Sequence, residues 1–537
     1  MKKFVFIFLL LLFAVSLSQL NGQQHEIVFQ QCYGGSLTEA PFDLISFVGG
    51  TYVLAGTHSD NGDVLYNHGD GDIWLYKISL DGTIMWQNTY GGSATEMPRQ
   101  FFKTGDSGFL IFGNTESSDG DVSGLHGGGD FWLVRTDSLG NLLWQKCLGG
   151  SNNDRPEQMI PAHDGGYIGI GSTCSDDGDI SHLYGAWDAW VVRVSEEGTL
   201  LWEKTYGGSG QDYGSSITAT ADGGYMLGAT ISSTTGYVNC ELTGLNDICD
   251  ASLIKIDSLG EIEWQQCYGG SDYDALIQIK QTTEGGYVFM ATTRSTDGDV
   301  SGFHGPGGDG NKSDLWVVKL DASGTIAWQR CLGGYENEQP GFLALHPDGG
   351  YLIGGNSNST EGDINCNASL PGTYTGWLVK LDASGEIAWQ RCLGSQVNNT
   401  FRTIEIIETE HYLIGATTRA NGGDVDCDLK GQTDIWLVEL MDTLTGIQAT
   451  VPATTPAITA RPNPAKHWVS ITYELPIGMS QVVLEVADAT GRLLGSEKLN
   501  NNKGQSLWDI RGISAGVYYY KLTGNGFAKS GKLVIVE

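Results

Sequence analysis

Basic residues are scarce in this chain. Its 537 residues include 30 Lys and Arg against 63 Asp and Glu, a formal net charge of −33. Nucleic acids and anionic membranes are bound through clustered Lys and Arg, so this balance argues against both as partners. Divalent cations and neutral ligands such as glycans remain compatible with it.

Long apolar runs are absent after the first residues. Lys2 and Lys3 precede an apolar run over residues 4–17, and small residues follow near Gly22. This order is typical of a secretory signal peptide, which we predict over residues 1–22. A short membrane anchor is the alternative, although a spanning helix needs ~20 apolar residues. We therefore expect an exported protein with no transmembrane segment after signal removal.

The motifs of common enzyme classes are also missing. The chain has no Cys-x-x-Cys, no His-Glu-x-x-His and no Gly-Lys-Ser/Thr phosphate loop. GPGGDG at 305–310 lacks the following helix of a dinucleotide site, and GISAG at 512–516 precedes an expected strand where a nucleophile elbow needs a helix. We expect no catalytic residues and no certain cofactor, so enzymatic activity is the less favoured interpretation.

What the chain has in quantity is a repeat. A Trp-Gln element, an Asp-x-Trp element and a DGGY-type element each occur seven times. The Asp-x-Trp elements are centred on Trp74, Trp132, Trp190, Ser252, Trp316, Trp377 and Trp436. A period of about 60 residues over about 415 residues indicates a repeat architecture.

Within one repeat the pattern is that of β-strands. In DLWVVKLD, Trp316, Val318 and Leu320 fall on one face, a period of two that predicts a strand. The DASG that follows is turn chemistry, and TIAWQRCL is the return strand. Two such hairpins make a four-stranded sheet that buries both faces only against neighbouring sheets. Radial closure protects the outer sheets, so we predict an all-β, seven-bladed β-propeller over residues 23–442.

The repeat is interrupted at its two ends. A Trp-Gln-type strand at residues 25–32 precedes the first Asp-x-Trp strand, and the last one, at 434–440, has no Trp-Gln strand after it. We expect the N-terminal strand to pair beside residues 434–440 and to close the ring. An open solenoid with capping repeats is the alternative, but it does not need this interrupted unit.

The hairpin pattern LD-x-x-G-x-x-x-W resembles the repeats of quinoprotein-like propellers. The whole unit, with GGS, DGGY and DGDVSG, is similar to the propeller repeats of exported Bacteroidetes surface proteins. This resemblance covers about residues 25–441. It implies an architecture and says little about activity.

The amino-acid composition of the chain changes after the repeats. Residues 443–460 carry no charge, six Thr and two Pro, which predicts an extended linker. Short alternating strands separated by Gly and Asn turns then predict a small β-sandwich over residues 461–537.

This last segment resembles the type A C-terminal sorting domain of type IX secretion substrates. The matching residues are Pro462, Asn463, Pro464, Gly491, Arg492, Gly516, Tyr518 and Lys532. The resemblance implies a secreted or outer cell-surface protein whose partners are the type IX machinery and a sortase-like peptidase that removes the module. The chain departs from the family at Glu537, where a basic residue is common. A carbohydrate-binding or fibronectin-like accessory sandwich is the alternative.

Nine of the ten cysteines fall into three sets. Five share one repeat position and are expected to be reduced core residues, because equivalent positions on adjacent blades should exceed the about 7 Å between Cα atoms that a disulfide tolerates. These are Cys32, Cys147, Cys267, Cys331 and Cys392. Cys240 and Cys249 lie in one long loop and are the candidate disulfide in an oxidising compartment. Cys366 and Cys427 occupy equivalent loops and pair only if those loops lean together.

Acidic loops precede the Asp-x-Trp strands. Asp119 and Asp121, and likewise Asp297 and Asp299, are paired carboxylates of the hard-oxygen type that suits Ca²⁺. Asp and Gly also form tight turns without a metal, and this is the preferred interpretation. His68, His126 and His304 recur in the same loops and are expected to be structural.

Repeat arrays place variable loops on one face, and loops carry function. We therefore expect a surface binding or adhesion module for a glycan or a protein. Its ligand face is predicted at loops 231–249 and 294–313, whose polar side chains include Tyr237, Asn239, Glu241, His304 and Asn311. A glycan-active hydrolase or lyase and a structural surface-layer protein are the alternatives, and fold alone does not choose among them.

Overall fold

The structure is a computed structural model. In the repeat region it describes residues 24–47, 50–238, 240, 249–305, 312–366, 372–408 and 411–443. Beyond residue 443 it describes residues 457–461, 468–474, 482–488, 492–499, 503–511, 513–524 and 527–536. The chain divides into two compact units, residues 25–443 and residues 444–537 together with 1–24. The predicted signal peptide lies outside the described residues.

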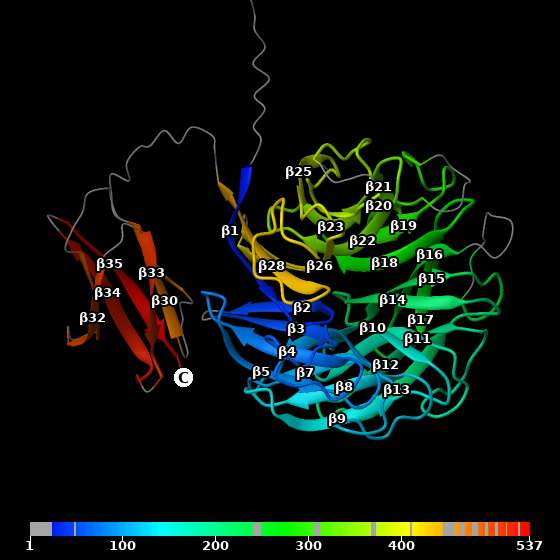
Figure 1. Cartoon of the computed structure of the whole chain (residues 1–537), viewed down its shortest axis with the longest axis horizontal. Helices are drawn as coiled ribbons and strands as arrows, with labels where there is room; N and C mark the ends of the chain where they lie inside the picture. Colours follow the sequence, from blue (N-terminus) through cyan, green and yellow to red (C-terminus); the bar gives the residue numbers. More distant parts are fainter. Residues whose placement is uncertain are drawn as a thin grey trace, which may run out of the picture. The chain divides into compact units, whose positions relative to one another are not determined.

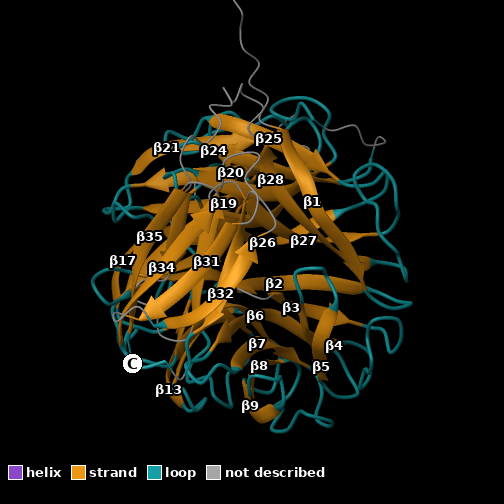
Figure 2. Cartoon of the chain, turned by 90° about the vertical axis from the view of Figure 1, so that its left-hand side faces the viewer, coloured by secondary structure: helices purple, strands orange, loops and turns teal. Residues whose placement is uncertain are grey.

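The described residues form strands and loops, with no helix among them (Figure 2). It follows that no described helix is long and apolar enough to cross a membrane. The described part of residues 24–443 forms seven sheets of four strands each. Repeated four-stranded antiparallel sheets are the architecture that the period and the alternation predict.

Six of these sheets take four consecutive strands, the first strand of each being the innermost. The first three sheets are β2 (Glu39–Phe47), β3 (Gly50–Thr57), β4 (Asp72–Ile78) and β5 (Ile84–Tyr90); β6 (Glu96–Lys103), β7 (Phe109–Thr115), β8 (Asp130–Thr136) and β9 (Leu142–Leu148); and β10 (Asp154–Pro161), β11 (Tyr167–Thr173), β12 (Asp188–Val194) and β13 (Leu200–Tyr206). The next three are β14 (Asp212–Ala219), β15 (Tyr225–Ile231), β16 (Asp250–Ile256) and β17 (Ile262–Tyr268); β18 (Asp274–Gln281), β19 (Tyr287–Thr293), β20 (Asp314–Leu320) and β21 (Ile326–Leu332); and β22 (Glu338–Leu345), β23 (Tyr351–Ser357), β24 (Thr375–Leu381) and β25 (Ile387–Leu393).

The last sheet joins the two ends of the repeat region. Its order is β1-β28-β27-β26, so β1 (Gln24–Tyr33) is hydrogen-bonded to β28 (Asp434–Thr443), with β27 (His411–Thr418) and β26 (Thr400–Glu408) inside (Figure 1). This is the pairing expected from the interrupted repeat. Trp436 Nε1 donates to Gln30 Oε1 across the two strands at 3.0 Å.

That last contact is one copy of a repeated pair. The indole of each Asp-x-Trp strand is fully buried, and its N–H donates to the residue after the Trp of the Trp-Gln strand, as Trp132 does to Gln145 (2.8 Å) and Trp316 to Gln329 (2.7 Å). Ser252 replaces the Trp in one sheet, and the Oε1 of Gln265 there has no hydrogen-bond partner. The repeated sequence elements are therefore the two halves of one buried hydrogen bond.

Neighbouring sheets pack through the turns between third and fourth strands. Tyr206 Oη donates to the carbonyl of Gly260 in the next sheet at 2.7 Å, and Tyr33 does the same to Gly82 at 2.6 Å. The innermost strands contact one another in the order β2, β6, β10, β14, β18, β22 and β26, and β26 in turn contacts β2. Strands of the first and last sheets therefore lie side by side.

The cysteine predictions are partly wrong. The structure contains three disulfides, Cys32–Cys427, Cys240–Cys267 and Cys366–Cys392. Each joins the loop before a sheet's third strand to the outermost strand of that same sheet, with Cα atoms 5.4–5.8 Å apart. The prediction considered the distance between adjacent sheets, whereas all three disulfides form within one sheet and its own loop. Cys240 pairs with Cys267 and not with Cys249. Cys147 and Cys331 are buried free thiols, as predicted.

The C-terminal unit has two sheets among its described residues, ordered β29-β30-β33 and β32-β31-β34-β35. Their bounds are β29 (Ala457–Arg461), β30 (Trp468–Glu474), β31 (Val482–Asp488), β32 (Leu493–Leu499), β33 (Lys503–Asp509), β34 (Gly516–Gly524) and β35 (Phe527–Ile535). Side chains of both sheets, including Ile471, Leu484 and Leu522, form one buried apolar cluster.

Candidate functional site

A bulge interrupts the innermost strand of every sheet in the repeat region. The pairing with the second strand skips one residue in each case, for example between Pro98 and Gln100 of β6. A bulge re-aims the skipped side chain. The skipped residues are Phe42, Arg99, Glu157, Ser215, Ile277, Gly341 and Arg402.

These seven residues line one cavity of about 740 Å³. Each innermost strand contributes to it, from β2 with Phe42 and Asp43 to β26 with Arg402. We call it the central cavity. Its volume lies in the range of small-molecule sites, and it is the candidate functional site.

In β2, β6, β10, β14 and β18 the residue after the bulge accepts a backbone N–H of the next sheet. Gln158 Oε1 accepts the backbone N–H of Ile217 at 2.8 Å, and Gln278 Oε1 accepts that of Leu343 at 2.6 Å. Asp43 holds the same position in β2 and accepts the N–H of Phe101 at 3.2 Å. The wall of the cavity is therefore fixed by hydrogen bonds between sheets.

Charged side chains gather on part of this wall. Arg99 Nη2 lies 3.1 Å from Glu157 Oε1, and the Arg402 guanidinium carbon lies 5.8 Å from the centre of the Phe42 ring. Burial raises the pKa of Glu157, against the opposing charge of Arg99. It also lowers the pKa of Arg402, to which the like charge of Arg99 adds.

Asp43 and Lys280 are two further charged groups that line the cavity. Burial raises the pKa of Asp43 to about 7, although the N–H groups of Phe101 and Leu44 and the charge of Lys280 oppose the shift. Burial lowers the pKa of Lys280, and Asp43 opposes that shift. Asp43 is thus less fully charged near neutral pH than it is in water.

Sequence reasoning missed the central cavity. Four of the innermost strands begin with an acid-x-Pro segment, and the residue after the Pro is Phe42, Arg99, Glu157 or Gly341. The residue after the Pro differs from repeat to repeat, whereas the acid and the Pro before it recur. This variation at one position of a repeated motif could have indicated a functional role.

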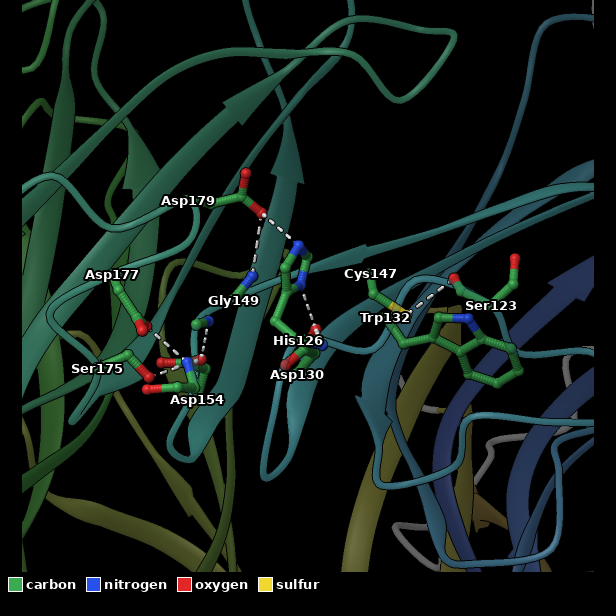
Figure 3. Close-up of polar contacts among 12 residues, drawn as sticks. Ser123, His126, Asp130, Trp132, Cys147, Gly149, Asp154, Ser175, Asp177 and Asp179 are labelled. Atoms are coloured by element: carbon green, nitrogen blue, oxygen red, sulfur yellow. Dashed lines mark hydrogen bonds and ion pairs between the residues drawn. The ribbon is translucent and has the colours of Figure 1, made fainter.

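The loop histidines connect sheets. His126 Nδ1 lies 2.7 Å from Asp130 Oδ2 and its Nε2 lies 4.0 Å from Asp179 Oδ2 of the next sheet (Figure 3). His68 and His304 make the equivalent contacts, to Asp72 and Asp121 and to Asp314 and Asp363. The structure therefore gives these histidines a structural role.

The calcium candidates accept hydrogen bonds from backbone N–H groups. Asp119 Oδ1 accepts the N–H of Ser93, and Asp297 Oδ1 that of Ser271, both at 2.7 Å. Asp121 and Asp299 accept the N–H groups of Gly91 and Gly269 at 3.3 Å. Among the described residues there is no group of three or more His, Cys, Asp or Glu side chains placed to hold a metal ion.

The predicted ligand face is only partly described. Asn239, Glu241 and Asn311 lie outside the described residues. Tyr237 is stacked between Tyr184 (5.9 Å between ring centres) and Tyr206 (6.1 Å), where other sheets have the His–Asp contact. Tyr237 is 37% exposed, so the ligand face at these loops stays a prediction, and the central cavity stands beside it as a second candidate site.

In the C-terminal unit the residues matched to the sorting motif have separate surroundings. Arg492 Nε lies 3.2 Å from Asp488 Oδ2, Tyr518 Oη donates to the Ser514 carbonyl at 2.7 Å, and Lys532 is exposed on β35. Gly516 begins β34. Pro462, Asn463, Pro464 and Gly491 lie outside the described residues.

Residues 460–536 match the family described as the secretion system C-terminal sorting domain. This segment is a type IX C-terminal sorting domain. The chain is accordingly exported to the cell surface or secreted.

No curated protein sequence matches the chain. Among solved structures it is similar to PorZ, a surface component of the type IX secretion system of Porphyromonas gingivalis, with a TM-score of 0.38 and 12% identity over 94% of this chain and 60% of that one. The chain thus spans less than two thirds of PorZ. It is also similar to the WD40 domain of Neurospora crassa Pan2, with a TM-score of 0.41 and 10% identity over 78% of this chain and 96% of that one.

Proposed function

We propose that the repeat region is a binding or adhesion module for a glycan or protein ligand, displayed at the cell surface or secreted. One observation carries the proposal: a cavity of about 740 Å³, to which every innermost strand contributes, in a chain with an export signal. Exported proteins act on what lies outside the cell. A cavity whose lining residues vary while their neighbours repeat is the part of this fold suited to recognition.

We further propose that the seven sheets form a closed seven-bladed β-propeller. The contact between β26 and β2 supports closure, as does the pairing of β1 with β28. So do the Cys32–Cys427 disulfide and the ion pair between Lys430 Nζ and Asp63 Oδ2 at 2.9 Å. A closed ring leaves no first or last blade exposed.

The export route is part of the same proposal. Residues 1–22 act as a cleaved signal peptide, and the C-terminal unit folds as a small sandwich that the type IX machinery binds and a sortase-like peptidase removes. The buried cluster shared by the two C-terminal sheets supports the sandwich.

The test is a screen of the chain from residue 23 to residue 537 on a glycan array and on candidate protein ligands. We expect at least one saturable ligand. Ser215 lines the cavity, so Ser215→Trp should obstruct it and abolish binding. Ser138 is exposed in a turn, which makes Ser138→Trp the matched control. Binding that survives Ser215→Trp would place the ligand elsewhere, and the absence of any saturable ligand on an abundant surface protein would favour a structural surface-layer role.

Calcium binding at Asp119, Asp121, Asp297 and Asp299 stays a proposal that the same material tests. A melting temperature that rises with Ca²⁺, falls with chelator and ignores both in Asp119→Asn/Asp121→Asn would support it. An identical response of the double variant would contradict it.

A glycan-active hydrolase or lyase is the second candidate. The observation that favours it is two carboxyl groups with raised pKa values, Asp43 and Glu157, in one cavity, since raised carboxyl pKa values suit general acid catalysis. New reducing ends formed from a bound glycan, and lost in Glu157→Gln, would establish it.

A further inference from the structure

The seven bulges present different chemistry on the two sides of the central cavity. From β26 through β2 and β6 to β10 the bulged residues are Arg402, Phe42, Arg99 and Glu157, while β14, β18 and β22 supply Ser215, Ile277 and Gly341. The bulged residues on one side of the cavity are therefore charged or aromatic, whereas those on the other side are uncharged, and two of these three are small. A ligand has polar partners on the first side and room on the second.

The cavity is locally basic within an acidic chain. Its charged lining residues are Arg99, Lys280 and Arg402 against Asp43 and Glu157. Three positive and two negative groups give a formal +1, whereas the whole chain carries −33. Burial raises the pKa of both carboxyl groups and lowers the pKa of Lys280 and Arg402, so it opposes charge of either sign in the cavity.

Part of this positive charge is available to a ligand. Arg99 lines the cavity, with its Nη2 3.1 Å from Glu157 Oε1. Arg402 makes no ion pair with another described residue, and its recorded contact is with the Phe42 ring. Burial lowers the pKa of Arg402, and the like charge of Arg99 lowers it further, which indicates that the two guanidinium groups are near each other. Two neighbouring guanidinium groups are more stable with an anion between them.

We propose that the central cavity binds an acidic saccharide, with the carboxylate of a uronic acid unit on Arg402 and Arg99 and its ring against Phe42. Guanidinium groups fit carboxylates in a bidentate way, and an aromatic face packs against the apolar face of a sugar ring. Neutral amide and hydroxyl groups such as those of Gln339 and Thr400 also line the cavity and suit sugar hydroxyls. This inference rests on the proposed binding function and names its ligand class.

The test uses isothermal titration of the chain from residue 23 to residue 537. The probes are tetramers of galacturonic, glucuronic and mannuronic acid and their methyl esters, which keep the ring and lose the charge. We expect at least one acid tetramer to bind, and its ester to bind about tenfold or more weakly, because a charge-assisted hydrogen bond contributes roughly 1.5–3 kcal/mol.

Three variants locate the contact. Arg402→Gln should weaken binding about tenfold or more, and Glu157→Gln, which releases Arg99, should strengthen it. Arg155→Gln is the matched control. Arg155 also lies over an aromatic ring, with its guanidinium carbon 4.7 Å from the centre of Trp187, but it does not line the cavity. Its variant should bind like the natural protein.

Several outcomes would overturn the proposal. They are equal binding of acid and ester, unchanged affinity in Arg402→Gln with a native circular dichroism spectrum, failure of all acid tetramers, and competition by sodium sulfate at the same concentration as the tetramer.

A second variant covers the case in which Arg402→Gln folds poorly: Phe42→Leu removes the aromatic ring and should also reduce the affinity. If the acid tetramers fail while another ligand binds and is lost in Ser215→Trp, the inference falls and the proposed function stands. If nothing binds, both fall.

Discussion

At the scale of the residue, the aspartate two positions before a repeat tryptophan accepts a backbone N–H of the loop that precedes it. Asp314 Oδ2 accepts the backbone N–H of His304 at 3.0 Å and contacts its Nδ1 at 2.7 Å. The other ring nitrogen of His304 lies 3.7 Å from Asp363 of the next sheet. One imidazole therefore links two sheets, and it does so best when both nitrogens carry protons.

This linkage predicts a pH-dependent contribution of His304. The hydrogen bond to Asp314 raises the pKa of His304 above 6.5, although burial opposes the shift. A raised histidine pKa means that the stabilisation is complete below about 6.5 and is lost as pH rises through the higher folded value. We expect the melting temperature of His304→Gln to fall further below that of the natural protein at pH 6 than at pH 9.

The exposed His163 provides the control. His163→Gln should shift the melting temperature little at either pH. A deficit of His304→Gln that is the same at pH 6 and pH 9 would show that protonation has no part in the contact.

At the scale of the element, sheet interfaces bury pairs of carboxyl groups. Asp188 of β12 and Asp212 of β14 flank Gly207, where a Cβ would overlap the Asp188 carboxyl. Oδ1 of Asp188 has no hydrogen-bond partner, and five equivalent aspartates share this feature. At one interface Thr375 and Asn399 replace both acids. Like charges in a buried site disfavour ionisation.

Removing one of these charges should stabilise the protein at high pH. Burial, with help from Asp212, raises the pKa of Asp188 to about 6. Asp188 therefore costs no folding free energy below its unfolded pKa of about 3.9. It destabilises the fold increasingly as the pH rises through its folded pKa of about 6. Asp188→Asn should be more stable than the natural protein by roughly 1–2 kcal/mol at pH 8, with the difference shrinking toward pH 5.

Denaturant titrations at the two pH values check this. Asp257 lies in an exposed turn, so Asp257→Asn serves as control. An Asp188→Asn variant that is less stable at pH 8 would show that the carboxylate makes a favourable interaction instead.

Two turns offer a matched glycine pair, Gly198 between β12 and β13 and Gly223 between β14 and β15. Gly198 has a φ of 76° and its Cβ position lies 2.6 Å from ring atoms of Trp144 in the preceding sheet. Gly223 has a φ of 90° and nothing within 4 Å of its Cβ position. Gly223→Ala should cost about 1–2 kcal/mol for backbone strain alone, and Gly198→Ala about 1–3 kcal/mol more because Trp144 must move. Equal losses in urea unfolding would contradict a packing role for the turn.

At the scale of the whole molecule, the sequence predicted what depends on local pattern. The alternation around Trp316 and the turn residues at Gly324 are patterns of adjacent residues, so the strands and their order could be predicted. The pairing of β1 with β28 could be predicted because the first and last repeats are each incomplete. The disulfides could not, because the pairing of Cys366 with Cys392 depends on how a loop folds back over its own sheet. The sequence also did not predict that the Arg99 side chain enters the cavity, because a bulge of one residue decides its direction.

The Cys32–Cys427 disulfide gives the last prediction, because it joins residues 395 apart in sequence, whereas Cys240–Cys267 joins residues 27 apart. In the chain-entropy view a disulfide stabilises more as it closes a longer loop, by about 3 kcal/mol for short loops and about 5 kcal/mol for long ones. Cys32→Ala/Cys427→Ala should therefore lower the melting temperature of the chain from residue 23 more than Cys240→Ala/Cys267→Ala. The first pair also holds β1 against the last sheet, so its loss should expose the β1 amides to hydrogen exchange first. An equal or smaller effect would mean that the hydrogen bonds between β1 and β28 and the contact of β26 with β2 suffice to hold the ends together.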